Sequence, residues 1–321
     1  MPNLTVAVLG PAGFAKDLGK TGTVSDITLY NLKKGDTSVT FIEPTRYPEK
    51  ISPLFFAVST ADKAIMVVDE VNAAFGETLL MLQCAGVAKG QLILRNFLTR
   101  DQLLPLIRGT VLEGYEVFAG NVNELREMLL DEAVAMGKNA GEPAPVGTVP
   151  IDHFFNVKGI GTVVLGSVAL GAIRAHDTVQ VLPIKKQAQV RSIQKLDEDA
   201  DIAVKGDRVG VSLKGIEATE LDRGYVLTND PGMKSSEVIT GRIDLVKFWT
   251  ISLRKGMVVH AGHWMQFLQG RIESVEEAGE PKRPQVTVRL DKELVHPPGA
   301  RAVLHYLEGG KLRVMGTLCL P

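Results

Sequence analysis

Cysteine is scarce in this sequence, and long apolar runs and an excess of one charge are missing from it. Its 321 residues include two cysteines, Cys84 and Cys319, too few for a disulfide framework or a cysteine-based metal cluster. No apolar run approaches the roughly 18 residues of a membrane span, and residues 1–3 do not begin a secretory signal. Basic and acidic side chains nearly balance, at a net charge of −1. We therefore expect a cytoplasmic protein with no membrane segment.

Strands and helices alternate in the first part of the chain. The length suits two or three domains, since a domain takes about 100–200 residues. Apolar, β-branched segments predict strands at 4–9, 25–31, 38–44, 63–69, 91–97 and 115–120. Apolar residues at helical spacing predict helices at 73–85, from Thr99 onward and at 121–133. This alternation indicates a mostly parallel sheet covered by helices on both faces.

The pattern changes after a segment rich in glycine and proline at 136–147. Beyond it, short strands are separated by Gly, Asp and Lys turns, which is typical of small closed barrels. We place the first domain at 1–140, a linker at 141–147 and two all-β domains at 148–230 and 231–321. The last of these carries 13 basic and 9 acidic residues. Its net charge of +4 suits either contact with nucleic acid or an ordinary charged surface.

The segment GPAGFAKD, residues 10–17, directly follows the first strand. A working phosphate loop has Gly, four residues, Gly, Lys, then Ser or Thr. Here Gly10 and Lys16 remain, but Ala15 replaces the second glycine and Asp17 replaces the hydroxyl residue. The Ala15 side chain limits how closely the backbone can wrap a phosphate. The Asp17 carboxylate would repel it. The loop therefore predicts weakened phosphate binding.

Residues 149–230 carry the most specific pattern in the chain. They contain PIDHFFNVKGIGTVVLG, VRSIQ, GDRVGVSLKG and RGYVL in that order. In this the sequence resembles the translational GTPases of the elongation factor Tu and SelB type, and SelB more closely. The resemblance covers nearly the whole chain. It implies a Ras-like G domain of the phosphate-loop NTPase class, with a mostly parallel sheet, followed by two β-barrels.

The resemblance also assigns the nucleotide motifs of the G domain. The family's Asp-x-x-Gly falls on residues 43–46, so Glu43 replaces the aspartate and Arg46 the glycine whose amide senses the γ-phosphate. Tyr47 follows, where the family has the histidine that positions the attacking water. A phenol with a pKa of about 10 is a poor proton acceptor at neutral pH.

The guanine motif of the family, Asn/Thr-Lys-x-Asp, falls on residues 94–97. Arg95 then takes the place of the lysine, and Phe97 that of the aspartate that accepts hydrogen bonds from guanine. An apolar ring at that position leaves those donors unpaired, which can cost a factor of about 10⁴ in discrimination. The last guanine-loop motif is reduced to Phe-Ala-Gly at 118–120.

Together these replacements predict a vestigial nucleotide site with no catalytic residue. Its residues are Gly10, Gly13, Ala15, Lys16, Asp17, Glu43, Arg46, Tyr47, Arg95 and Phe97. We expect no cofactor and no GTP binding. The alternative is an active GTP hydrolase that uses GTP and Mg²⁺ in a site rebuilt around Lys16, Arg46 and Arg95.

In elongation factor Tu the aminoacyl end of tRNA lies near the first strand of the second domain. The resemblance carries this pocket onto Asp152, His153, Phe155 and Thr162. The alternative is an ordinary barrel edge with Phe155 in the core. His260 and His263 are three residues apart, but they have no cysteine or carboxylate cluster nearby in sequence, so we expect no metal site.

Three functions remain open from the sequence. The first is an elongation-factor-like protein that has lost GTP binding and hydrolysis and that binds tRNA, another RNA or the ribosome. The second is a GTP-binding elongation GTPase with an atypical site. The third is an adaptor that docks on a translation-related protein.

Overall fold

The computed structural model describes residues 2–139, 141–276, 279–280, 282–308, 310 and 312–321. The chain divides into two compact units, and each is considered by itself. The first unit comprises residues 1–140 and 311–314, and the second comprises 141–310 and 315–321. Among the described residues, no helix combines the length and the apolar character needed to cross a membrane.

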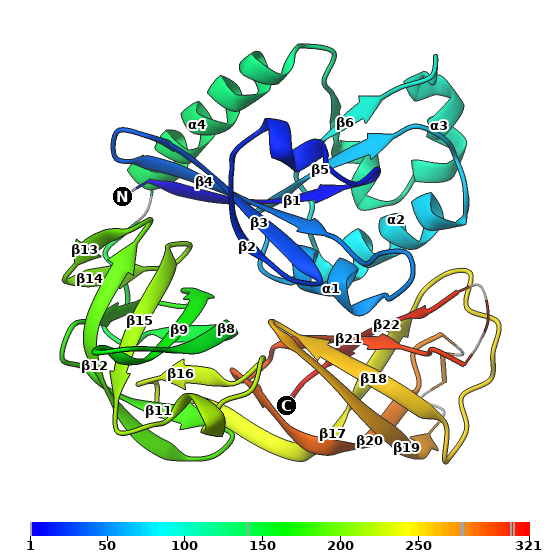
Figure 1. Ribbon diagram of the computed structural model, residues 1–321. Helices are drawn as coiled ribbons and strands as arrows, with labels where there is room; N and C mark the ends of the chain where they lie inside the picture. Colours follow the sequence, from blue (N-terminus) through cyan, green and yellow to red (C-terminus); the bar gives the residue numbers. More distant parts are fainter. Residues whose placement is uncertain (1, 140, 277–278, 281, 309, 311) are drawn as a thin grey trace. The chain divides into compact units, whose positions relative to one another are not determined.

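A seven-stranded mixed sheet forms the centre of the first unit (Figure 1). Its strands are β1 (Asn3–Leu9), β2 (Lys20–Val24), β3 (Ile27–Lys34), β4 (Thr37–Pro44), β5 (Lys63–Val68), β6 (Gly90–Leu94) and β7 (Glu116–Val117). They lie in the order β2-β3-β4-β1-β5-β6-β7. β4, β1, β5, β6 and β7 run parallel, whereas β2 and β3 form antiparallel pairs at one edge. The carboxyl ends of β1, β4, β5 and β6 therefore meet at one edge of the sheet.

Helices cover both faces of this sheet (Figure 1). They are α1 (Ser52–Ser59), α2 (Ala73–Ala85), α3 (Arg100–Ile107) and α4 (Val122–Asn139), with short 3-10 helices η1 (Phe14–Asp17) and η2 (Val111–Gly114). Alternate residues of β1, Leu4, Val6 and Val8, share a buried cluster with Leu125 and Leu129 of α4. α1 packs against α2 and β4. A strand whose two faces are both covered is mostly apolar, as β1 is from Val6 to Leu9.

Local signals set the ends of two helices as expected. The Asn72 side chain accepts a hydrogen bond from the Phe75 amide at the start of α2, and Gly86 ends that helix in the left-handed conformation. Thr99 and Gln102 form a capping box at the start of α3. These residues place both helices where their apolar spacing predicts them.

Other elements of the first unit differ from expectation. α1 was not predicted, because its residues 53–58 are all buried and give no amphipathic stripe. β2 was missed too, since KTGTV is largely exposed and polar. The strand expected at 115–120 is only two residues long, and α4 continues to Asn139 beyond the predicted end at 133. The strand expected to reach 97 ends at 94, because the next residues turn.

The second unit begins with a barrel. Its elements are β8 (Thr148–Val157), β9 (Gly161–Ser167), β10 (Ala172–Arg174), β11 (Thr178–Leu182), β12 (Lys186–Lys195), β13 (Glu198–Ala200), β14 (Ile202–Val204), β15 (Arg208–Lys214), η3 (Ala218–Glu220) and β16 (Val226–Thr228). The strands follow the order β11-β16-β8-β9-β15-β12, and β12 pairs with β11 to close the ring. Alternate strand residues, mostly valine, isoleucine and leucine, fill its interior.

A second closed barrel follows in the order β17-β20-β19-β18-β21-β22. Its strands are β17 (Lys234–Leu245), β18 (Val258–His263), β19 (Gln266–Glu276), β20 (Gln285–His296), β21 (Arg301–His305) and β22 (Val314–Cys319). The predicted fold class, an α/β domain with a mostly parallel sheet followed by two β-barrels, is therefore confirmed.

Candidate functional site

The loop after β1 turns at two glycines. Gly10 has a φ of 125° and Gly13 a φ of 91°. A Cβ atom at Gly10 would lie 2.3 Å from the carbonyl oxygen of Val67, so only glycine fits there. After Gly13 the chain makes the four-residue η1 and then enters β2. Within the described residues 10–24, no α-helix follows the loop to direct its dipole at a phosphate.

The backbone amides of this loop donate hydrogen bonds to a side chain of the protein, that of Glu43. Glu43, at the end of β4, is buried with 6% of its surface exposed. Its Oε1 accepts hydrogen bonds from the Gly13 amide at 2.8 Å and, more weakly, from the Ala15 amide at 3.4 Å. Successive backbone amides that point at one oxygen form an anion-binding nest. In this nest the bound anion is the carboxylate of Glu43.

The other oxygen of Glu43 is held by Tyr30 of β3. The phenol donates to Oε2 at 3.2 Å. Burial and the neighbouring carboxylate both raise the pKa of Tyr30, which keeps the phenol protonated as a donor. The sequence reasoning missed this partner. Thr28 pairs with Glu43 across β3 and β4, so Tyr30 lies two residues further along the same face.

The charged residues of the loop lie outside the nest. Lys16 and Asp17 are both exposed. They line a separate cavity together with residues of β2, β3 and α4. Lys16 therefore does not take the position of a lysine bound to phosphates in the loop, whose amides Glu43 occupies.

Arg46 and Tyr47 follow β4 and differ in environment. Arg46 is exposed. The Tyr47 hydroxyl donates to the carbonyl oxygen of Ala74 at 3.0 Å, and its ring centroid lies 5.9 Å from the guanidinium carbon of Arg313. Burial raises the pKa of Tyr47 well above its usual value of 10. Such a phenol cannot act as a general base at neutral pH.

The residues after β6 occupy the positions of the expected guanine motif. The Arg95 guanidinium lies 5.3 Å from the centre of the Phe14 ring and 3.7 Å from the Asp69 carboxylate. Phe97 has a φ of 63° and a fully exposed side chain. Asn96, at a φ of 52°, donates to the backbone oxygen of Asp69 at 3.1 Å. The Phe97 side chain thus has no hydrogen-bond acceptor for a base, and it does not line the cavity described next.

A cavity of about 360 Å³ lies beside this region, at the carboxyl ends of β1 and β5. The chain leaves β1 toward the β2–β4 side and later returns on the other side through β5, so this is the switch point of the sheet. Its walls include Gly10, Tyr47, Asp69, Asn72 and Asn96. Of the residues predicted for the nucleotide site, only Gly10 and Tyr47 line this cavity.

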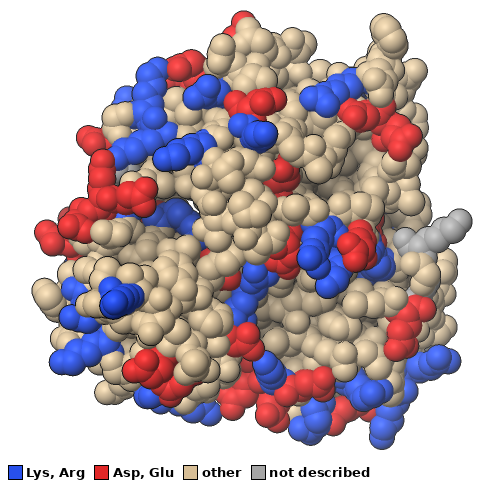
Figure 2. Space-filling model, in the orientation of Figure 1, with Lys and Arg blue, Asp and Glu red and all other residues tan. Residues whose placement is uncertain are grey.

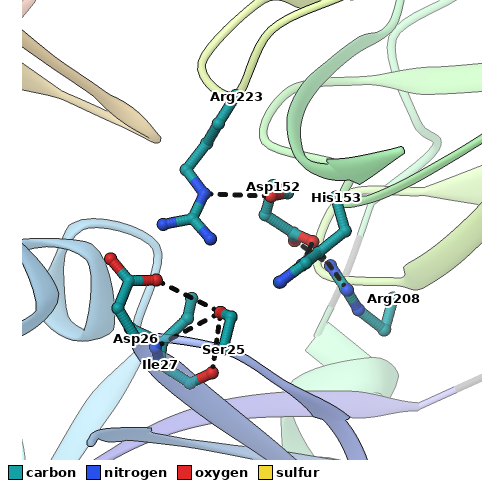
Figure 3. Close-up of polar contacts among 7 residues, drawn as sticks. All are labelled: Ser25, Asp26, Ile27, Asp152, His153, Arg208 and Arg223. Atoms are coloured by element: carbon teal, nitrogen blue, oxygen red, sulfur yellow. Dashed lines mark hydrogen bonds and ion pairs between the residues drawn. The ribbon is translucent and has the colours of Figure 1, made fainter. Parts of the chain in front are cut away.

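Four predicted residues of the second unit lie on β8 and β9. The Asp152 carboxylate is buried and bonds the Arg208 guanidinium through both oxygens, one of them at 2.9 Å (Figure 3). His153 Nδ1 lies 2.7 Å from Asp152 Oδ1. The Arg223 Nε donates to the Asp152 backbone oxygen at 3.1 Å. Burial alone would raise the pKa of Asp152, but the Arg208 charge and the hydrogen bonds from His153 and Arg208 lower it. Asp152 is thus a paired anion that orients its neighbours.

Phe155 and Thr162 do not join this cluster. Phe155 is 44% exposed, so the reading that places it in the core is wrong. Thr162 is buried, and its hydroxyl donates to the Ile216 carbonyl at 2.8 Å. A register shift between Ile151 and His153 redirects the side chains of β8 at this point. Of the predicted pocket, Phe155 is therefore exposed and His153 is partly buried.

The histidines of the last barrel are part of its aromatic packing. The His260 ring stacks on Phe267 with centroids 5.2 Å apart, and the His263 ring lies 4.3 Å from Trp264. His263 Nδ1 donates to the Arg301 carbonyl at 3.0 Å, and burial lowers the pKa of His263 to about 4. The described residues contain no group of three or more His, Cys, Asp or Glu side chains that could hold a metal ion.

Comparison with known proteins gives matches along the whole chain. The family model "Elongation factor Tu domain 2" matches residues 161–228. An uncharacterized protein of Methanocaldococcus jannaschii is 36% identical over 320 residues, covering 99% of both chains. The selenocysteine-specific elongation factor of the same organism is 25% identical over 292 residues, which is 83% of this chain and 62% of that protein.

Solved structures agree on the fold. The translation elongation factor SelB of Methanococcus maripaludis, in complex with the GTP analogue GppNHp, has a TM-score of 0.83 at 20% identity. That alignment covers all of this chain and 79% of the other. A bacterial selenocysteine-specific elongation factor has a TM-score of 0.80 at 20% identity and is covered over 58% of its length.

Proposed function

Because this chain belongs to the SelB-like translation elongation GTPase family, we propose that it is an RNA-binding translation factor whose first domain no longer uses GTP. The proposal has two parts. The first domain is a fixed scaffold with its phosphate loop filled by Glu43. The barrels contact tRNA or the ribosome.

The contact between Glu43 and the loop carries the first part. The Gly13 and Ala15 amides that would bind a phosphate oxygen already donate to Oε1 of Glu43. A phosphate brought to about 4 Å of that carboxylate would meet a repulsion of about 4 kcal/mol at an effective dielectric of about 20. Moving Glu43 aside instead would break its bond with Tyr30 as well. Either route disfavours nucleotide binding.

The residues present do not fit GTP and Mg²⁺ at the other positions either. Asp17 replaces a neutral hydroxyl ligand of Mg²⁺ and is itself anionic. Arg46 is exposed. Phe97 points to solvent where an acceptor for guanine would be needed. The SelB structure in complex with GppNHp therefore serves as a guide to the fold of this chain and not to its ligand. We propose that the protein functions without a nucleotide cofactor.

Membership in the family supports the second part. Besides the uncharacterized protein, the relatives include two selenocysteine-specific elongation factors. In this chain the barrel edge of β8 presents the exposed Phe155 ring and the His153 ring, which Asp152 orients. Aromatic rings stack on unpaired bases, so this edge suits the single-stranded end of an RNA. The specific RNA and any selenocysteine role lie beyond this proposal.

Calorimetric titration of GTP, GDP and ATP, each with Mg²⁺, tests the first part. We expect no saturable heat with any of them up to about millimolar concentration. A tRNA titration tests the second part, with Phe155→Ala against Phe248→Ala, an exposed phenylalanine elsewhere in the second unit. Tight GTP binding would overturn the first part. Equal tRNA affinity for both variants would remove the β8 edge as the contact.

A further inference from the structure

A second cavity in the first unit is lined by four cationic side chains. Its volume is about 470 Å³. Its walls come from the consecutive elements η1, β2 and β3 and from α4, which lies about 90 residues later in the sequence. The polar and charged residues that line it are Lys16, Asp17, Lys20, Asn31, Lys33 and Arg126. Four cations against one carboxylate leave a local formal charge of +3.

Two neighbouring acidic groups are held away from the cavity. On α4, the carboxylate of Glu127 bonds the Lys34 ammonium at 2.5 Å and does not line the cavity. Glu43 is held by the amides of Gly13 and Ala15 and likewise does not line it. Figure 2 shows Lys and Arg side chains, with Asp and Glu side chains among them, at the upper left, where Figure 1 draws α4 and the strands beside it. The side chains that line the cavity therefore carry more positive than negative formal charge.

The short η1 explains why the cations meet here. Because the chain enters β2 three residues after Asp17, Lys20 pairs with Asn31 at the start of the β2–β3 ladder. Lys16 therefore lies beside strand residues of the sheet edge instead of at the start of a long helix. Arg126 reaches the cavity from α4, which packs on β1 and β4.

The geometry points to a phosphate-binding site in this cavity, separate from the loop filled by Glu43, that holds the phosphates of an RNA backbone. Lysine and arginine side chains on four elements can surround one or two phosphate groups, and an RNA backbone releases counterions when they do so. This inference rests on the proposed RNA-binding function. A free polyphosphate carries the same chemistry, and the test separates the two sources.

The test uses the full chain and two probes, a single-stranded RNA of about 20 nucleotides and inorganic tripolyphosphate. The double variant Lys20→Glu with Arg126→Glu reverses two cations on different elements. Lys89→Glu is the matched control, since Lys89 is exposed in the same unit and does not line the cavity. Circular dichroism and thermal unfolding check that each variant folds.

We expect the double variant to bind RNA at least about tenfold more weakly at low salt. The slope of log K against log salt should fall by about 1.4, at about 0.7 per lost phosphate contact on a single strand. The control should match the wild type. A third result separates the two claims. If the wild type binds tripolyphosphate but not RNA, and the double variant loses tripolyphosphate binding, the phosphate site is supported and the RNA-binding function is contradicted.

Two results overturn the inference. If the double variant binds both probes like the wild type, the cavity is not a phosphate site, although RNA binding elsewhere on the chain would survive. If the wild type binds neither probe at low salt, the site and the RNA-binding function fall together.

Discussion

Glu43 in the first unit and Asp152 in the barrel of residues 148–228 are both buried carboxylates, but their partners differ. Glu43 is held by backbone amides and a phenol. Asp152 is held by the opposite charge of Arg208 and by His153. Backbone amides can form a site for a bound anion, whereas the charges of Asp152 and Arg208 neutralise each other within the fold. The first region therefore places its own side chain where a ligand would lie.

The largest expected effect comes from the pair in the barrel. Asp152→Ala should lower the free energy of unfolding by about 3–5 kcal/mol, because it leaves the Arg208 guanidinium buried without its counterion. Urea unfolding followed by circular dichroism measures this. Asp222→Ala is the control in the same barrel, since Asp222 forms an exposed pair with Lys292 and should cost less than about 1 kcal/mol. Equal losses for the two variants would contradict the account of Asp152.

The second-largest effect on stability is expected in the barrel of residues 234–319, where His263 is buried in its neutral form. The pKa of His263 is lowered by burial from 6.5 to about 4, so the unfolded chain binds the proton more readily than the folded one. Stability should be highest above pH 6.5 and fall as the pH drops toward 4, by about 3 kcal/mol at about 1.4 kcal/mol per pKa unit. Chemical unfolding at a series of pH values measures this slope.

His263→Leu is the variant that isolates the histidine. It should flatten the slope between pH 6.5 and 4, although the pKa values of His260 and His296 are lowered by burial as well and keep part of it. A slope unchanged by the substitution would show that His263 is not the group responsible.

Glu43→Ala should cost less free energy of unfolding than Asp152→Ala, and it tests whether the site of Glu43 can hold a bound anion. It leaves the Gly13 and Ala15 amides and the Tyr30 hydroxyl without an acceptor, at a cost of about 1–3 kcal/mol. Because an empty nest binds anions, phosphate in the medium should raise the melting temperature of this variant. Thermal unfolding with and without tens of millimolar phosphate, at about constant ionic strength, measures both.

Two controls define that contrast. Glu43→Gln keeps an acceptor oxygen in the nest and should respond little to phosphate. Phe97→Ser should not respond at all, because the exposed Phe97 side chain leaves no buried donor unpaired when it is removed. If phosphate stabilised Phe97→Ser as much as Glu43→Ala, the response would not come from the emptied nest.

The smallest effect is expected at Phe97. Its side chain is fully exposed, so Phe97→Ser should change the free energy of unfolding by less than about 0.5 kcal/mol. Phe97→Asp would restore the carboxylate of the guanine motif. It should still give no GTP binding in calorimetry, because Glu43 keeps the loop filled. GTP binding by Phe97→Asp would show that the base position alone had been limiting.

The sequence predicted the fold class and two helix starts because they depend on local signals. Apolar spacing and the caps at Asn72 and Thr99 act within a few residues. α1 was missed because it is buried all round. The sequence motifs assigned Glu43 and Gly13 to one site, and the structure brings them together.

What spacing could not predict is how the site is completed. The bond from Tyr30 depends on the register of β3 and β4, and the meeting of Phe14 with Arg95 depends on two strands returning to one edge. Lys16 lines the other cavity because η1 is short. The sequence does not predict this, since Lys16 has the spacing from Gly10 that the lysine of a working phosphate loop has. The pairing of Asp152 with Arg208 joins residues 56 positions apart. Each is a long-range contact that composition and periodicity do not encode.

The central claim is that Glu43 fills the phosphate loop, and the amide resonances of Gly13 and Ala15 report on it directly. Two-dimensional NMR of the ¹⁵N-labelled protein during titration with GTP and Mg²⁺ is the measurement. The account predicts that neither resonance moves in the wild type up to about millimolar nucleotide, and that both move in Glu43→Gln before any nucleotide is added. A saturable shift of the Gly13 amide with GTP in the wild type would contradict it.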